Sequence, residues 1–117
     1  MSRLKPCPAS PNCVLSTAAA DEMHRIAPFP FTGPAADALA RVKAAALSFP
    51  RTAVVEEAPG YLKMTFTSAL FRFVDDVELE VDEAAKVVNV RSASRVGRSD
   101  LGANRKRVEA IRAKLGG

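Results

Sequence analysis

The spacing of apolar residues divides the chain into a helix, four strands and a second helix. Over residues 35–49 apolar side chains recur every three or four positions, which predicts an amphipathic helix that Pro50 ends. The spacing then changes to that of strands in four segments, 52–58, 61–68, 71–81 and 86–96. A second helix is predicted over residues 99–117, with Ser99 or Asp100 as its cap and Gly116-Gly117 at its end.

Short turns join the four predicted strands, so neighbouring strands must be antiparallel. We therefore expect an α+β fold: a two-layer sandwich with a four-stranded antiparallel meander sheet and two helices on its apolar face. Residues 1–34 hold six of the eight prolines and both cysteines, and they predict an irregular N-terminal arm. A length of 117 residues is typical of a single domain, which would cover residues 1–117.

One acidic residue falls on the helix-facing side of the predicted sheet. If residues 82–85 close a simple hairpin, residue 81 pairs with 86 and Asp75 lies opposite Ser92. Asp75 has the parity of Phe73 and Val77, both expected in the core, so its carboxylate needs a partner. The same register places Asp76 opposite Arg91 on the outer face. The residues able to reach Asp75 on the inner side are Ser92, Ser94, Asn104 and Arg105.

This inner cluster has two interpretations. It either anchors the last helix to the sheet or binds a ligand. The second interpretation draws on a basic segment that contains serines, glycines and a helix start, and such a segment suits a phosphate or carboxylate. Its basic residues are Arg91, Arg95, Arg98, Arg105, Lys106 and Arg107. Asp100, at the helix start, would compete with an incoming anion.

Cys7 and Cys13 enclose five residues, and three states are open to them: a disulfide, free thiols, or a metal site with His24 and one of Asp21 and Glu22. The spacing matches no compact zinc pattern, so we assign no metal site and no cofactor. A thiol enzyme would need His24, the only histidine, as its base. We assign no catalytic residue.

Charge and composition narrow the class of partner. The net charge is +4, which permits an anionic partner. With no Trp and one Tyr, the chain lacks the stacking residues of nucleic-acid binders. We therefore do not expect it to bind nucleic acid. No run of apolar residues is long enough to span a bilayer, and the first residues lack the apolar core of an export signal. The chain is then cytoplasmic, unless an export segment was removed.

Two blocks, CPASPNC and RSASRVGRSDLGANRKR, resemble the bacterial and plastid family known as domain of unknown function 1499, as do DEMHRIAP and LFRFVDDVELEVD. The resemblance extends from Leu4 to about Leu115. The resemblance implies a periplasmic or membrane-associated location for the domain and favours a disulfide between Cys7 and Cys13. The family positions that this chain matches are Cys7, Pro8, Ser10, Pro11, Asn12, Cys13, Asp21, His24, Phe73, Asp75, Asp76, Arg91, Ser92, Ser94, Arg95, Gly97, Asp100, Gly102, Asn104 and Arg105.

The function we expect is that of a noncatalytic binding or accessory domain for an anionic small molecule, a lipid headgroup or a protein partner. Its candidate ligand-binding residues are Asp75, Arg91, Ser92, Ser94, Arg95, Asn104, Arg105 and His24. One alternative is a small hydrolase or thiol-dependent enzyme that uses Cys7 or Cys13 with His24 and Asp75. The other is a purely structural module.

Overall fold

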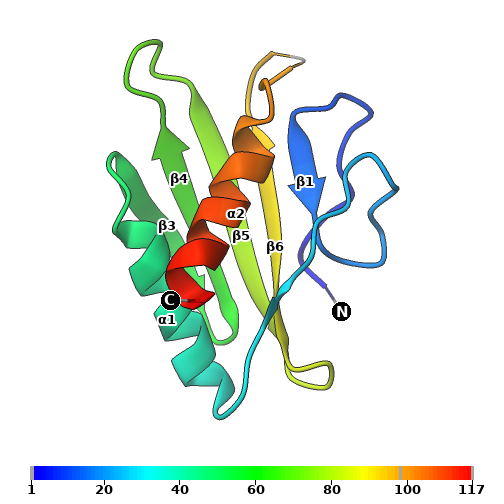
Figure 1. Ribbon diagram of the computed structural model, residues 1–117, viewed down its shortest axis with the longest axis vertical. Coiled ribbons are helices and arrows are strands. Elements are labelled where there is room, and N and C mark those ends of the chain that lie inside the picture. The colour runs from blue at the N-terminus through cyan, green and yellow to red at the C-terminus, as the bar shows by residue number, and fades with distance from the viewer. Residues whose placement is uncertain (1, 98, 117) are drawn as a thin grey trace.

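The computed structural model describes residues 2–97 and 99–116. Arg98, which belongs to the basic segment, and Gly117, the expected end of the last helix, lie outside these ranges. Within them the chain forms the following helices and strands (Figure 1): β1 (Cys13–Leu15), β2 (Phe29–Pro30), α1 (Ala35–Leu47), β3 (Thr52–Ala58), β4 (Tyr61–Thr67), β5 (Val74–Asp82), β6 (Val87–Ser94) and α2 (Ala103–Gly116).

The strands form one open antiparallel sheet in the order β1-β6-β5-β4-β3, and β2 also pairs with β6. The predicted meander is therefore present as β3 to β6, but the predicted number of four strands is wrong. The two additional strands come from the arm, which is not wholly irregular. They occupy successive stretches of one β6 edge, where Cys13 pairs with Ala93 and Phe29 with Val88. The arm thus covers main-chain groups that would otherwise form an exposed sheet edge.

Both helices pack on one face of the sheet, as predicted (Figure 1). In α1 the buried residues are Ala38, Val42 and Ala46, the stripe expected of an amphipathic helix. In α2, Val108 and Ile111 are the buried apolar residues that face the sheet. Between helices and sheet lies a hydrophobic core that includes Leu62, Met64, Phe66, Val77, Leu79, Val88 and Val90. The start of the arm crosses the opposite face, where Leu4 and Leu15 pack with Tyr61.

The register of the β5–β6 hairpin differs from the prediction by two residues. Asp82 pairs with Val87, so Asp75 lies opposite Ser94 rather than Ser92, and Asp76 lies opposite Ala93 rather than Arg91. The cause is the turn: Lys86 has a φ of 57°, and the Asp82 carboxylate accepts a hydrogen bond from the Ala85 amide. A shift of two residues preserves parity, so the same side chains still face the helices.

Three apolar residues expected in the core are exposed instead. Phe71 and Phe73 lie before the start of β5, in a turn over residues 68–73. The Ser68 hydroxyl accepts a hydrogen bond from the Phe73 amide, and Arg72 has a φ of 57°. Leu101, expected in the stripe of the last helix, lies before α2 and is 87% exposed. Phe71 and Phe73 fit the alternation of β5, and Leu101 fits the helical spacing of α2, but all three residues lie before the element begins.

Candidate functional site

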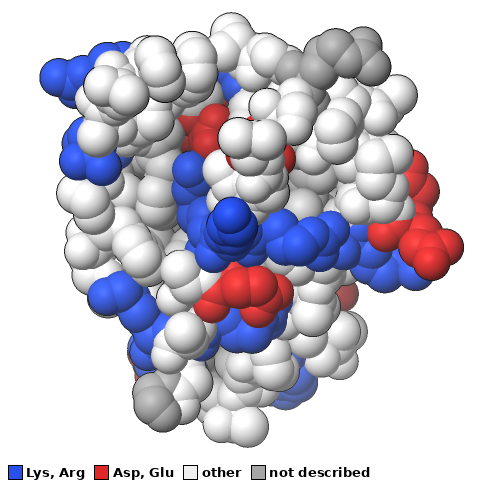
Figure 2. Space-filling model, turned by 45° about the horizontal axis from the view of Figure 1, so that its top comes forward, with Lys and Arg blue, Asp and Glu red and all other residues white. Residues whose placement is uncertain are grey.

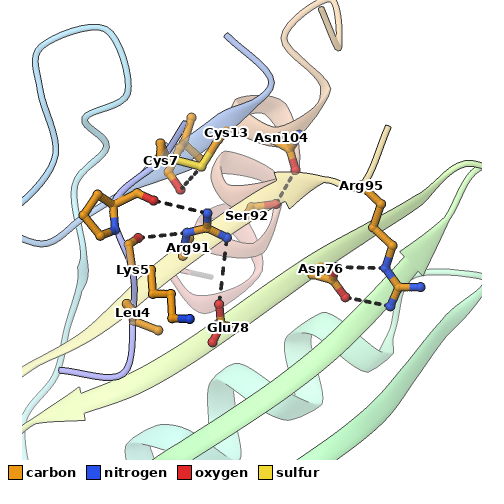
Figure 3. Close-up of polar contacts among 12 residues, drawn as sticks. Leu4, Lys5, Cys7, Cys13, Asp76, Glu78, Arg91, Ser92, Arg95 and Asn104 are labelled. Atoms are coloured by element: carbon orange, nitrogen blue, oxygen red, sulfur yellow. Dashed lines mark hydrogen bonds and ion pairs between the residues drawn. A yellow bond between two sulfur atoms is a disulfide. The ribbon is translucent and has the colours of Figure 1, made fainter. Parts of the chain in front are cut away.

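A buried polar network lies between the sheet and the first turn of α2. Its inner residues Asp75, Ser92 and Asn104 are buried. The parity of the strands predicts this for Asp75 and Ser92, and the apolar stripe of the last helix predicts it for Asn104. The carboxamide oxygen of Asn104 accepts a hydrogen bond from Ser92 Oγ at 2.6 Å (Figure 3), and its Nδ2 donates to Ser94 Oγ at 2.9 Å. The structure thus brings together four of the predicted candidate residues, with Asn104 at their centre.

Arg107 completes the network, although the sequence assigned it only to the basic segment. Its guanidinium lies 2.8 Å from the Asp75 carboxylate and donates to the Asn104 carboxamide oxygen at 2.9 Å. It also lies 4.9 Å from the centre of the Phe66 ring. The sequence signal that could have placed Arg107 in the network was its spacing, because a residue three positions after Asn104 lies on the same side of a helix. Arg107, rather than Arg105, is the partner of the inward carboxylate.

Asp100 and Asn12 close the network at its two ends. Asp100 accepts hydrogen bonds from the main-chain amides of Gly102 and Asn104 and from Asn104 Nδ2, at 2.8, 3.0 and 2.7 Å. Burial opposes ionisation of this carboxyl, but these hydrogen bonds outweigh it and lower its pKa. The main-chain oxygen of Asn12 accepts from Asn104 Nδ2. The donors that could have received an external anion at the start of α2 are therefore used within the fold.

Two candidate arginines turn to the outer face of the sheet. Arg91 lies between the sheet and the arm (Figure 3), where it donates to the main-chain oxygen of Lys5 at 2.9 Å and lies 3.9 Å from Glu78. Arg95 makes two hydrogen bonds of 2.9 Å to the Asp76 carboxylate, and these hold the pKa of Asp76 below its usual range. The expected pair of Asp76 with Arg91 is thus wrong, because the register moved.

Arg105 does not reach the inner cluster. It donates to the main-chain oxygens of Arg25 and Met23, at 2.9 and 3.3 Å, and so ties α2 to the arm. His24, a further candidate, lies in the same part of the arm and is buried. Its Nδ1 is 2.6 Å from the Asp21 carboxylate and its Nε2 is 2.8 Å from the Ser10 carbonyl oxygen. Both ring nitrogens face acceptors, an arrangement that the protonated imidazolium satisfies.

This arrangement predicts a pH dependence of stability. The Ser10 carbonyl raises the pKa of His24 most, and Asp21 adds to it, while burial and Arg105 oppose the shift. The stabilising contribution is complete below the unfolded pKa of about 6.5 and is lost as the pH rises through the higher folded value. We expect the free energy of unfolding to fall as the pH rises above about 6.5. Urea unfolding of the protein and of His24→Gln measures this.

Only the wild-type protein should show that decrease. Asp21, whose pKa is lowered by its hydrogen bonds with His24, stays ionised throughout this range and adds no slope. A wild-type stability that is constant, or that rises with pH, would contradict the assignment of an imidazolium.

Cys7 and Cys13 form a disulfide. In this state neither sulfur is a thiolate, so neither is available as a nucleophile. The alternative of a thiol enzyme also needs a ring nitrogen of His24 free to act as a base, and both already have partners. Across residues 2–97 and 99–116, no three His, Cys, Asp or Glu side chains lie together as a metal site would require.

A second surface, which the sequence did not reveal, lies where β4 ends and β5 begins. We call it the loop end: the 68–73 turn, residues 95–97 and 99–102, and the adjoining Arg51 and Lys106. The two segments leave the sheet together, because the Arg95 amide donates to the Val74 oxygen. Their exposed apolar residues are Leu70, Phe71, Phe73, Val96 and Leu101. Figure 2 tips this end toward the viewer and shows uncharged surface with Lys and Arg side chains beside it.

The sequence was compared with models of known protein families and with curated proteins. The family model described as a protein of unknown function, DUF1499, matches residues 3–115. No curated protein matches the chain. In the part of the chain that the structure describes, no helix combines the length and apolar character needed to cross a membrane. The match includes the disulfide loop, the network around Asn104 and the loop end, and the chain belongs to the DUF1499 family.

Proposed function

We propose that the chain is a noncatalytic accessory module that binds a negatively charged partner through the loop end. The observation that carries this proposal is that basic side chains of the loop end are exposed and have no acidic partner among the described residues. Three basic side chains are exposed and take part in no ion pair among the described residues: Arg51, Arg72 and Lys106. Three acids at this end of the sheet are engaged within the fold: Asp75 with Arg107, Asp76 with Arg95, and Asp100 at the start of α2.

The inner cluster is less suited to this role. A ligand at Ser92, Ser94 and Asn104 would have to break hydrogen bonds that are already made, and it would have to displace Arg107 from Asp75. Replacing satisfied buried contacts by new ones gives little net free energy. We therefore assign the inner cluster to the anchoring of α2 and assign contact with a partner to the exposed side chains.

Neutralising two basic residues of the loop end is expected to weaken binding strongly. A basic side chain near an anionic surface contributes about 1 kcal/mol, so Arg72→Gln with Lys106→Gln should lower affinity roughly 30-fold. Binding is measured by sedimentation with phosphatidylglycerol vesicles and by retention on immobilised polyglutamate, each at low and at high salt. Affinity for whichever anionic surface binds should fall as salt rises.

The matched control removes the same charge from elsewhere. Arg41→Gln with Lys86→Gln lowers the net charge equally, but Arg41 lies in α1 and Lys86 lies in the β5–β6 turn, at the opposite end of the sheet. Its affinity should stay close to that of the wild type. If the wild type binds neither surface, or if the two double variants lose affinity equally, the loop end is not the binding surface. The chain would then act as a structural module, the remaining alternative.

A further inference from the structure

We infer that the partner of the loop end is the surface of an anionic lipid bilayer, into which its apolar side chains insert. This inference rests on the proposed function and names the partner of the same site. Its basis is the joint presence of exposed apolar tips and exposed cations at one end of the molecule. Leu70 is 80% exposed, Phe71 68% and Leu101 87%.

The exposed apolar residues are concentrated rather than scattered. Elsewhere in the described chain the large exposed apolar residues are Met23, Leu47 and Val55, and they belong to three different segments. Single exposed apolar side chains are common on proteins, whereas a group of five at one end marks an interaction surface. The rings of Phe71 and Phe73 stack with their centres 5.6 Å apart, so they present one continuous apolar face.

The turn that carries these rings is held in a defined shape. Ser68 donates its amide hydrogen to the Phe73 oxygen and accepts from the Phe73 amide through its hydroxyl. Next to it the Thr67 amide donates to the Arg51 oxygen. Insertion would therefore require little new ordering of the main chain, which lowers the entropic cost of binding.

The arrangement suits a bilayer better than an acidic protein. Two hollows of the described chain lie elsewhere, one at the other end of β4, around Tyr61 and Glu80, and one along α1, around Phe29 and Leu115. The apolar tips line neither of them. Tips of Leu and Phe flanked by Arg and Lys match a membrane interface, in which apolar groups enter the acyl region while cations meet anionic headgroups. An acidic protein would satisfy the cations but would leave these tips in water.

The absence of tryptophan from the chain permits a direct test of insertion. Phe71→Trp places a single indole on the apolar tip, and Val55→Trp places one in the middle of β3, outside the loop end, at a site that is 52% exposed. With vesicles of phosphatidylglycerol, Phe71→Trp emission should shift to shorter wavelength, and brominated acyl chains should quench it. Val55→Trp should show neither effect.

The outcomes separate insertion from binding in general. If both variants sediment with phosphatidylglycerol vesicles and the Phe71→Trp indole is neither shifted nor quenched, insertion is refuted while the binding of an anionic surface stands. Retention on polyglutamate without binding to vesicles likewise refutes the lipid partner and supports an acidic protein. Leu70→Asp should reduce vesicle affinity at least tenfold, and Val55→Asp should not. Equal loss in these two variants overturns the inference.

Discussion

Replacing Asn104 by alanine is expected to lower the free energy of unfolding by about 3 kcal/mol. The carboxamide accepts from Ser92 and Arg107 and donates to Ser94, Asp100 and the Asn12 main chain. Alanine would leave several of these groups without a partner in a buried place, and each such group carries a desolvation cost of about 1–3 kcal/mol. Urea unfolding followed by far-UV circular dichroism measures the loss.

A second asparagine provides the control for that measurement. Asn89 lies on the outer face of β6 and accepts one hydrogen bond, from the Ser16 hydroxyl. Asn89→Ala should cost at most about 1 kcal/mol, the usual net value of one hydrogen bond. Equal losses for the two variants would show that the inner network does not hold α2 to the sheet.

Removal of the disulfide is expected to cost about 2 kcal/mol, the chain-entropy value for so short a ring. The ring fixes the loop that contains Asn12, whose side chain donates to the Gly97 oxygen and whose main chain contacts Asn104. Cys7→Ala with Cys13→Ala should therefore loosen the arm and the β6–α2 loop together. Thermal unfolding of the double variant, of the wild type, and of the wild type with a reducing agent measures the effect.

Reduction and mutation should agree in that experiment. Alanine removes one atom from each cysteine side chain, the sulfur, and keeps Cβ in the buried Cys13 site, so both treatments mainly release the ring. Hydrogen exchange gives the second readout, and amides of residues 12–16 should lose the most protection. An unchanged midpoint in both treated samples would show that the other contacts of the arm hold it in place without the disulfide.

The sequence predicted the helices, the meander and the inward side of β4, β5 and β6 because these follow from periods that local burial imposes. It could not fix the β5–β6 register, which depends on the left-handed conformation of Lys86 in the turn. It also missed β1 and β2, since strands of three and two residues carry no period. Short strands of this kind form only because the edge of β6 is already in place.

For the candidate site, strand parity correctly placed Asp75 and Ser92 inward and the helical stripe did so for Asn104, but the partners of the arginines were not predictable. Arg91 and Arg105 donate to main-chain oxygens of the arm, and such acceptors have no sequence signature. The loop end was missed for a related reason. Phe71 and Phe73 continue the alternation of β5, and only the turn at Ser68 shows that they lie beyond it. Exposure there depends on where the sheet stops.

The central claim is that the loop end meets the partner while the inner network only anchors α2. It is tested most directly by amide chemical shifts of the isotope-labelled protein, titrated with bicelles containing phosphatidylglycerol. We predict shifts concentrated at residues 70–73, 96 and 101–102, with little change at Asp75, Ser92 and Asn104. Shifts centred on Ser92, Ser94 and Asn104, with the turn at residues 68–73 unaffected, would contradict the account.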